Sequence, residues 1–122
     1  MLMQFDKEQE ELRRTLRRFL ETKSSSEEVR RLMETEEGYD PAVWKQMAEQ
    51  LGLQGLAIPE EFGGSGFSIL ETALVTEEMG RALLPAPYLA TVLAANLLQL
   101  SDDQQAQADL LPSIADGTTI AT

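Results

Sequence analysis

Helix start and stop signals recur along this chain, and they constrain its fold more than any other feature of the sequence. A short polar side chain ahead of an apolar stripe of helical spacing caps the free amide groups of a new helix, and a following glycine ends it. The candidate caps are Ser25, Asp40, Ser68 and Ser101, and the candidate stops are Gly38, Gly52 and Gly117. Because these signals enclose one stripe after another, we predict an all-α, up-and-down-like bundle of about five to seven helices.

Three of the caps are followed at the third position by Glu or Gln, which is the spacing of a reciprocal capping box. These pairs are Ser25–Glu28, Ser68–Glu71 and Ser101–Gln104. Asp40 is followed instead by Pro41, a favoured first helical residue, and then by a stripe that includes Trp44. We expect Trp44 in the core, and we expect Pro112 to kink or restart the last helix.

The first predicted helix spans Phe5 to Leu20, with acidic residues first and arginines last, the order that the helix dipole favours. Its arginines at positions 13, 14, 17 and 18 could form a phosphate-binding patch. Glu10, however, lies within helical reach of Arg13 and Arg14. This spacing favours a solvated face of local ion pairs.

The stretch from Tyr88 to Leu100 is apolar nearly all round, with only Thr91, Asn96 and Gln99 interrupting it. That pattern is typical of a helix surrounded by other helices, so we expect it to be the most buried helix of the bundle. It is also the longest strongly apolar stretch, and it is well short of the ~20 residues needed to cross a bilayer. We therefore expect a soluble, cytoplasmic protein with no membrane partner.

The composition excludes several kinds of site. The chain has no Cys and no His, so it offers no disulfide, no thiolate nucleophile, no cysteine zinc site and no imidazole base. Its formal net charge of −11 disfavours nucleic acid as a partner, because Lys and Arg supply most of the affinity for phosphate backbones. The sequence assigns no catalytic, metal-ligating or cofactor-binding residue.

The segment Pro59 to Gly66, "PEEFGGSG", raises the question of a phosphate-binding loop. Its glycine spacing matches neither the dinucleotide fingerprint nor the ATP-binding loop. Glu60 and Glu61 also occupy the place where a cation would help to bind an anion. A turn with positive φ angles, leading to the Ser68 cap, is the favoured interpretation.

Two ordered motifs in this chain resemble a known family. The run "VWKQMAEQLGLQGLAIPEEFGGSGFSILETALVTEEMGRAL" (43–83) is similar to the N-terminal helical domain of acyl-CoA dehydrogenases, which carry a "G-L-x-x-[IV]-P-E-E-x-G-G-x-G" passage followed by an "EE-[ML]-[GA]" helix. The run "LLPSIADGTTIAT" (110–122) resembles the "LP-x-[IL]-A-x-G" segment that leads into the middle β domain of that family. The resemblance covers almost the whole chain.

The resemblance implies a flavoenzyme that removes the α and β hydrogens of an acyl-CoA thioester. Its cofactor would be FAD, and its electrons would pass to an acceptor such as electron-transferring flavoprotein. In that family the subunit has three domains, with the flavin and the catalytic base mainly in the other two. We therefore expect residues 1–117 to be the helical domain and the strand-like residues 118–122 to begin a β domain that is missing here. We expect this chain alone to hold no flavin and to be inactive.

The resemblance also suggests a substrate class and a pocket. The proline-broken "LLPAPYLATVLAANLL" (83–98) looks like members that act on bulky, ring-bearing acyl-CoAs, some of which are hetero-oligomers. A homo- or hetero-oligomer is therefore expected. The family places an N-domain helix along the acyl chain, and on that basis the predicted acyl-pocket residues are Tyr88, Thr91, Val92 and Ala95. For any one of them, core packing is the alternative.

Two other classes of protein remain open at this point. An acyl-carrier-like protein needs a serine for its prosthetic arm, and the nearest candidate is Ser68, which a helix cap explains as well. A stand-alone acidic helical interaction module shares the same composition. It accounts for neither the glycine loop nor the strand-like tail.

Overall fold

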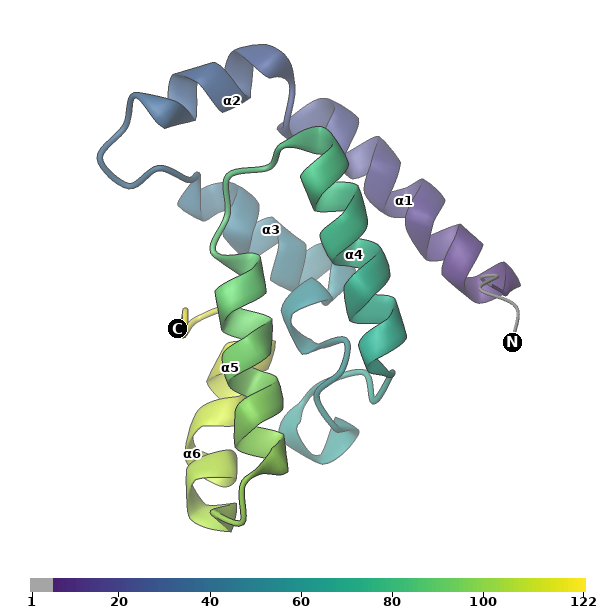
Figure 1. The fold of residues 1–122 in the computed structure, drawn as a ribbon, viewed down its shortest axis with the longest axis vertical. Coiled ribbons are helices and arrows are strands. Elements are labelled where there is room, and N and C mark those ends of the chain that lie inside the picture. The colour runs from purple at the N-terminus through teal and green to yellow at the C-terminus, as the bar shows by residue number, and fades with distance from the viewer. Residues whose placement is uncertain (1–5) are drawn as a thin grey trace.

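The computed structural model describes residues 6–122, which form six α-helices and two short 3₁₀ turns (Figure 1). The helices are α1 (Lys7–Lys23), α2 (Ser26–Met33), α3 (Pro41–Leu51), α4 (Ile69–Ala82), α5 (Tyr88–Leu100) and α6 (Gln104–Ala115). The 3₁₀ turns are η1 (Leu53–Gly55) and η2 (Glu60–Phe62). Within this range there is no strand, which confirms the predicted all-α bundle. Phe5, the first residue of the predicted stripe, lies outside the described residues.

The predicted cap signals set the starts of three of the six helices in residues 6–122, namely α2, α3 and α4. The Asp40 carboxylate accepts the Ala42 N–H at 2.9 Å ahead of α3, and Gly52 ends that helix with a φ of 60°. Ser68 and Glu71 form the predicted capping box of α4. α6 continues through Pro112 to Ala115, so the helix does not restart there.

Two of the cap predictions are wrong in part. The Ser25 hydroxyl accepts the Glu28 N–H at 3.3 Å, but the Glu28 carboxylate pairs with Arg31 at 2.8 Å and does not complete a capping box. Ser101 does not cap α6; it ends α5 instead, where its N–H and its hydroxyl both donate to the Leu98 carbonyl. Asp103, two residues later, caps α6 by accepting the Ala106 N–H at 3.0 Å.

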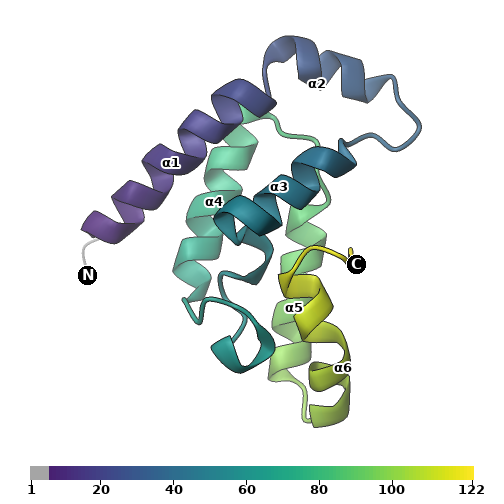
Figure 2. The ribbon, with the colours of Figure 1, turned by 180° about the vertical axis from the view of Figure 1, so that it is seen from behind.

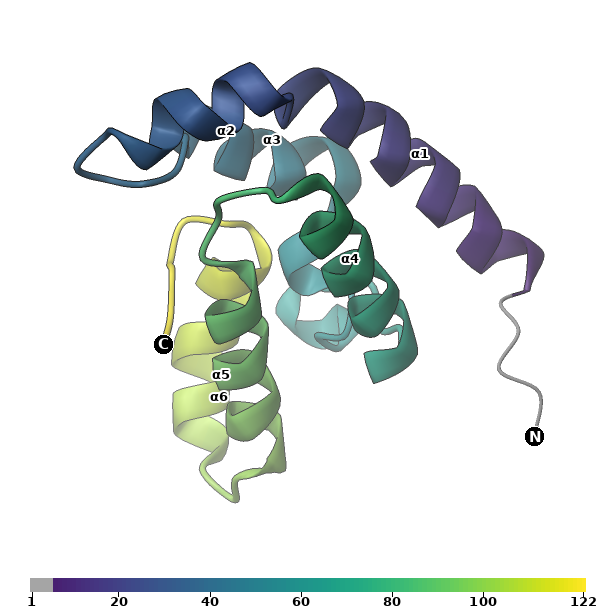
Figure 3. The same cartoon turned by 45° about the horizontal axis from the view of Figure 1, so that its top comes forward.

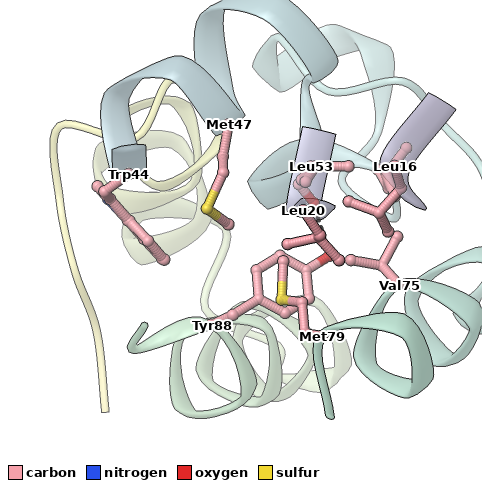
Figure 4. Close-up of a cluster of buried hydrophobic side chains, with 9 residues drawn as sticks. Leu16, Leu20, Trp44, Met47, Leu53, Val75, Met79 and Tyr88 are labelled. Carbon is pink, nitrogen blue, oxygen red and sulfur yellow. Dashed lines mark hydrogen bonds between the residues drawn. The ribbon is translucent and has the colours of Figure 1, made fainter. Parts of the chain in front are cut away.

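The larger of two apolar clusters lies among α1, α3, α4 and the start of α5 (Figure 4). Leu16 and Leu20 of α1 pack there against Val75 and Met79 of α4 and against Met47 of α3. Trp44 is 4% exposed, as predicted, and its Nε1 donates to the Gly117 carbonyl at 2.9 Å. This bond ties α3 to the turn that follows α6.

A second, smaller cluster joins α5 and α6 to the loop after η1, and it contains Ile58, Ala95, Leu111 and Ile114. Gly55 lets the η1 turn approach α6 closely, because a Cβ built there would lie 3.1 Å from the Cβ of Ala115. Figure 2 shows α5 and α6 as a hairpin at one end of the molecule, with α1 and α2 at the other. The hairpin is therefore packed against the rest of the domain on one side only.

α5 is not the most buried helix, contrary to the sequence prediction. Tyr88, Thr91 and Ala95 are buried, but four leucines on the other faces of α5 are 53–75% exposed. These leucines are Leu89, Leu93, Leu97 and Leu100. The sequence pattern shows apolar side chains nearly all round α5, but the prediction that other helices surround it is wrong within residues 6–122, where these leucines stay exposed.

Candidate functional site

An apolar groove of about 740 Å³ lies between α5 and α6. Its α5 wall includes four residues at successive spacings of three, one and three, which share one face of the helix: Ala90, Leu93, Ala94 and Leu97. α6 contributes Ala106, Leu110 and Ile114 at intervals of four, and the tail contributes Thr119, Ala121 and Thr122. We call this feature the α5–α6 groove.

The α5 wall of the groove combines small and large apolar residues. Ala90 and Ala94 have small side chains that leave room beside the helix, and Leu93 and Leu97 have large ones. Leu97 is 71% exposed and Leu110 is 43% exposed, so the groove opens to the outside along its length. A concave, mostly hydrocarbon surface of this volume is the usual setting for a small apolar ligand.

Charged groups are scarce in the α5–α6 groove. Asp103 is the one charged residue among those that line it, and its carboxylate is engaged in capping α6. A flavin dinucleotide carries a pyrophosphate that needs cations or a row of free N–H donors. The described residues of the groove offer no basic side chain, so they do not fit that cofactor. The mostly apolar lining fits a hydrocarbon ligand instead.

The four predicted pocket residues lie on the other side of α5. Tyr88, Thr91 and Ala95 are at most 3% exposed, and Val92 is half-buried against the larger apolar cluster. The Tyr88 hydroxyl donates to the Leu53 carbonyl at 2.7 Å, and its burial raises the pKa of the phenol well above the ordinary value. None of the four lines the α5–α6 groove. Their assignment to an acyl pocket stays a prediction.

Sequence reasoning did not assign the groove residues, because the residue pattern of α5 carries only a weak signal for which of its faces is open. A helix that is apolar all round has no polar side to mark its exposed surface. Ala90 and Ala94 are recognisable as small residues, but their exposure follows only from where α5 sits in the fold. The one usable signal was the pairing of leucines with these alanines, three and four positions apart.

The glycine loop does not present its amide groups to a ligand. The N–H groups of Ser65, Gly66 and Phe67 bond back to the carbonyls of Gly55, Ile58 and Leu56 at 2.8–2.9 Å. Gly63 and Gly66 have φ angles of 89° and 70°, as expected for a tight turn. The turn interpretation is therefore confirmed. Ser68, the candidate attachment point of an acyl carrier, caps α4.

An ion cluster centred on one buried carboxylate joins α1 to α4. The guanidinium of Arg17 donates two hydrogen bonds, at 2.9 and 3.0 Å, to the carboxylate of Glu78, whose side chain is 2% exposed. The Nε of Arg13 also lies 3.5 Å from this carboxylate, and Arg13 pairs with Glu10 at 3.9 Å. The predicted local pairing therefore holds for Arg13. No sequence signal indicated the Glu78 partner, which is far away along the chain.

The Glu78 carboxylate stabilises the fold in a way that depends on pH. Hydrogen bonds from Arg17, and then its positive charge, hold the pKa of Glu78 below its ordinary value of 4.5 despite the opposing effect of burial. A carboxyl group with a lowered pKa in the folded state contributes stability that is complete above its unfolded pKa. That contribution is lost as the pH falls through the lower, folded pKa.

Replacing Glu78 with Gln should lower the free energy of unfolding by about 2 kcal/mol at pH 7, because two charge-assisted hydrogen bonds are weakened. The difference from wild type should shrink as the pH falls below 4.5, where the unfolded chain takes up the proton, until the folded carboxylate is protonated as well. Urea unfolding at pH 7 and pH 3 measures both effects. Glu77→Gln, at the exposed neighbouring position, is the control and should change little. A Glu78→Gln difference that is equal at both pH values would contradict this account.

The described residues hold no metal-binding cluster and no membrane span. Nowhere in residues 6–122 do three or more potential acidic ligands come together as they would around a metal ion. None of the helices in that range has the length and hydropathy needed to cross a bilayer.

Comparison with known proteins identifies relatives over nearly the whole chain. The family model described as "Acyl-CoA dehydrogenase, N-terminal domain" matches residues 6–118. The acyl-CoA dehydrogenase IpdE2 of Mycolicibacterium smegmatis is 43% identical over 94% of this chain and 36% of its own length. The IpdE2 protein of Mycobacterium tuberculosis is 38% identical over 93% of this chain and 35% of its own length. This chain thus spans about a third of the length of these relatives.

Two solved structures have a similar fold over nearly the whole chain. The ChsE4-ChsE5 complex from Mycobacterium tuberculosis matches with a TM-score of 0.87 and 27% identity, over 98% of this chain and 33% of the matched chain. A variant of the Tcur3481-Tcur3483 steroid ACAD matches with a TM-score of 0.85 and 30% identity, over 93% of this chain and 31% of the matched chain.

Proposed function

The chain belongs to the acyl-CoA dehydrogenase family, whose N-terminal domain it matches, and we propose that it works as the helical domain of a longer subunit that dehydrogenates an acyl-CoA thioester. The reaction removes one hydrogen from Cα and one from Cβ of the acyl group, which leaves a double bond between these carbons. The two electrons pass to an external acceptor, for which electron-transferring flavoprotein is the candidate. The lengths of the relatives support a subunit about three times as long.

The α5–α6 groove is the observation that carries the proposed role of this domain. We assign it to apolar contact within the intact enzyme, with the face of α5 formed by Ala90, Leu93, Ala94 and Leu97 along the acyl group. A long or ring-bearing acyl group is itself hydrocarbon, and burying it against such a face contributes about 25 cal/mol per Å². The domain would therefore supply binding and substrate selection, while the groups that react belong to other parts of the subunit.

A bulky, ring-bearing acyl group is the substrate class that we propose. One of the similar structures is that of a steroid ACAD, and it shares 30% of its residues with this chain over the matched region. The groove volume of about 740 Å³ is large enough for such a group. A short, straight acyl chain would leave much of this surface uncovered.

FAD is the proposed cofactor of the intact enzyme, where it would accept the electrons taken from the acyl group. The residues of the groove do not fit a flavin dinucleotide, so we place its binding elsewhere in the subunit. The Asp103 carboxylate that lines the groove is held by the Ala106 N–H and is not assigned as the base. This chain by itself would neither retain flavin nor oxidise an acyl-CoA.

A homo- or hetero-oligomer is the proposed assembly. Two of the similar structures carry paired names, ChsE4-ChsE5 and Tcur3481-Tcur3483, and the first is described as a complex. The exposed leucines of α5, together with Met33 at 74% exposure on α2, leave apolar surface that other chains or domains would cover.

The test compares the 122-residue chain with a protein extended along the same reading frame. The extended protein should stay yellow through gel filtration and should reduce an artificial electron acceptor when given a steroid side-chain acyl-CoA. The 122-residue chain should do neither. Flavin retained by the short chain would overturn the proposal that other parts of the subunit bind the flavin. A flavin-loaded extended protein that oxidises no acyl-CoA, or a stop codon directly after Thr122, would overturn the proposed function.

A further inference from the structure

Thr91 joins α5 to the tail of the chain through its buried hydroxyl. Its side chain is 0% exposed, and its Oγ1 lies 2.7 Å from the carbonyl oxygen of Pro87, the residue before α5. The same oxygen lies 3.3 Å from the Ala121 N and 3.2 Å from the Ala121 carbonyl oxygen. A hydroxyl has one proton to donate, and the shorter distance favours Pro87 as its acceptor. The Thr91 oxygen then accepts the N–H of Ala121.

The tail that Thr91 contacts is also a wall of the α5–α6 groove. Thr119, Ala121 and Thr122 line the groove beside residues of α5 and α6. The near end of this tail is fixed to the end of α6, where the Thr119 N–H donates to the Ser113 carbonyl at 3.0 Å. Figure 3 shows the tail leaving the end of α6 and running back beside the α5–α6 hairpin. Its far end is held by Thr91.

We propose that Thr91 is a positioning residue: its hydroxyl seats residues 118–122 as a wall of the α5–α6 groove and thereby sets the width of that groove. Without the bond from Ala121, the stretch beyond Thr119 would be held beside α5 only by the packing of the Ala121 side chain against the smaller apolar cluster. Apolar packing fixes the position of a backbone less narrowly than a directional hydrogen bond does, so this wall would be less firmly seated. The hydroxyl is placed for this task because α5 turns Thr91 away from solvent and toward the tail.

The width of the groove matters for the choice of substrate, and this consequence rests on the proposed function. A wall held close to α5 limits how far an acyl group can extend sideways across Ala90 and Ala94. If the tail is released from α5, the enzyme should accept wider acyl groups or should discriminate less between wide and narrow ones. Thr91 would then affect specificity without touching the reacting atoms.

The first test measures hydrogen exchange of backbone amides in the 122-residue chain by NMR. Thr91→Val keeps the shape of the side chain but removes the hydroxyl, while Thr91→Ser keeps the hydroxyl. The Ala121 amide should exchange about fivefold faster, or more, in Thr91→Val, and Thr91→Ser should restore most of its protection. The Leu111 amide, in the core of α6, is the internal control and should stay protected in both variants.

Equal protection of Ala121 in wild type and Thr91→Val would overturn the proposal. So would a loss of protection at Leu111 that matches the loss at Ala121, because that result indicates general destabilisation. If Thr91→Val does not fold, Thr91→Ser still decides: an Ala121 amide that exchanges freely in this variant, with Leu111 protected, contradicts a role for the hydroxyl.

A second test uses the extended, flavin-containing subunit. The ratio of kcat/KM for a ring-bearing acyl-CoA to that for a straight-chain acyl-CoA should change in Thr91→Val and return in Thr91→Ser. An unchanged ratio, with Ala121 protection lost, would show that the tail is seated by Thr91 but does not select substrate. An extended wild-type protein without activity would count against the proposed function. The hydrogen-exchange result would still show whether Thr91 holds the tail.

Discussion

Gly64→Ala is expected to destabilise the protein by about 4 kcal/mol or more, the range of exceptional single substitutions. A Cβ built on Gly64 would lie 2.0 Å from the Ile58 carbonyl oxygen and 2.6 Å from the Gly55 carbonyl oxygen. Both are backbone atoms. They also accept hydrogen bonds, from Gly66 and from Ser65 respectively, so neither can move aside without breaking the loop. Urea unfolding followed by circular dichroism measures the loss.

Two other glycines provide matched controls for Gly64→Ala. Gly63 has a φ of 89° and no atom within 4 Å of a built Cβ, so Gly63→Ala should cost only about 1–2 kcal/mol of backbone strain. Gly80 lies within α4 with no atom in the same range, and Gly80→Ala should stabilise the helix by about 0.5–1 kcal/mol. If Gly64→Ala proves no more harmful than Gly63→Ala, the close approach of Gly64 to Ile58 is not a constraint on this fold.

In the extended subunit, Ala94→Phe is expected to raise KM for a ring-bearing acyl-CoA by about 10- to 100-fold over its effect on a short acyl-CoA. Ala94 is half-buried and lines the α5–α6 groove, so a phenyl ring there takes space that only the larger substrate needs. Because the groove is open, the melting temperature should stay close to that of wild type. Steady-state kinetics with both substrates and a thermal unfolding curve give the required numbers.

The neighbouring Ala95→Phe is the matched comparison and should behave differently. Ala95 is 3% exposed and packs against Ile58, Leu111 and Ile114, so a larger side chain should cost about 1–3 kcal/mol of stability. Activity on both substrates should then fall together with the melting temperature.

The Ala94→Phe and Ala95→Phe pair also tests the pocket that the sequence predicts. If Ala95→Phe or Val92→Phe raised KM for the bulky substrate alone, at an unchanged melting temperature, the acyl group would lie against the predicted face. It would then not lie in the α5–α6 groove. Equal effects of Ala94→Phe on both substrates would likewise contradict the groove assignment.

Local signals in the sequence predicted the helices and the glycine turn. Asp40, Ser68 and Gly52 act on backbone groups within a few residues of themselves, so their roles do not depend on the rest of the fold. Where two local candidates compete, as Ser101 and Asp103 do before α6, the choice depends on where the preceding helix ends. The order of two family motifs likewise indicated the acyl-CoA dehydrogenase family without any structure.

Only the tertiary structure decided which apolar face stays open and which charges meet. α5 is apolar on every side, and the exposure of Leu93 and Leu97 follows from the position of the α5–α6 hairpin at one end of the domain. Arg17 and Glu78 are far apart in the sequence, as are Thr91 and Ala121, and they meet because packing brings their elements together. Hydrophobic burial has no direction, so an amino-acid pattern specifies how much surface a helix can bury but not which neighbours bury it.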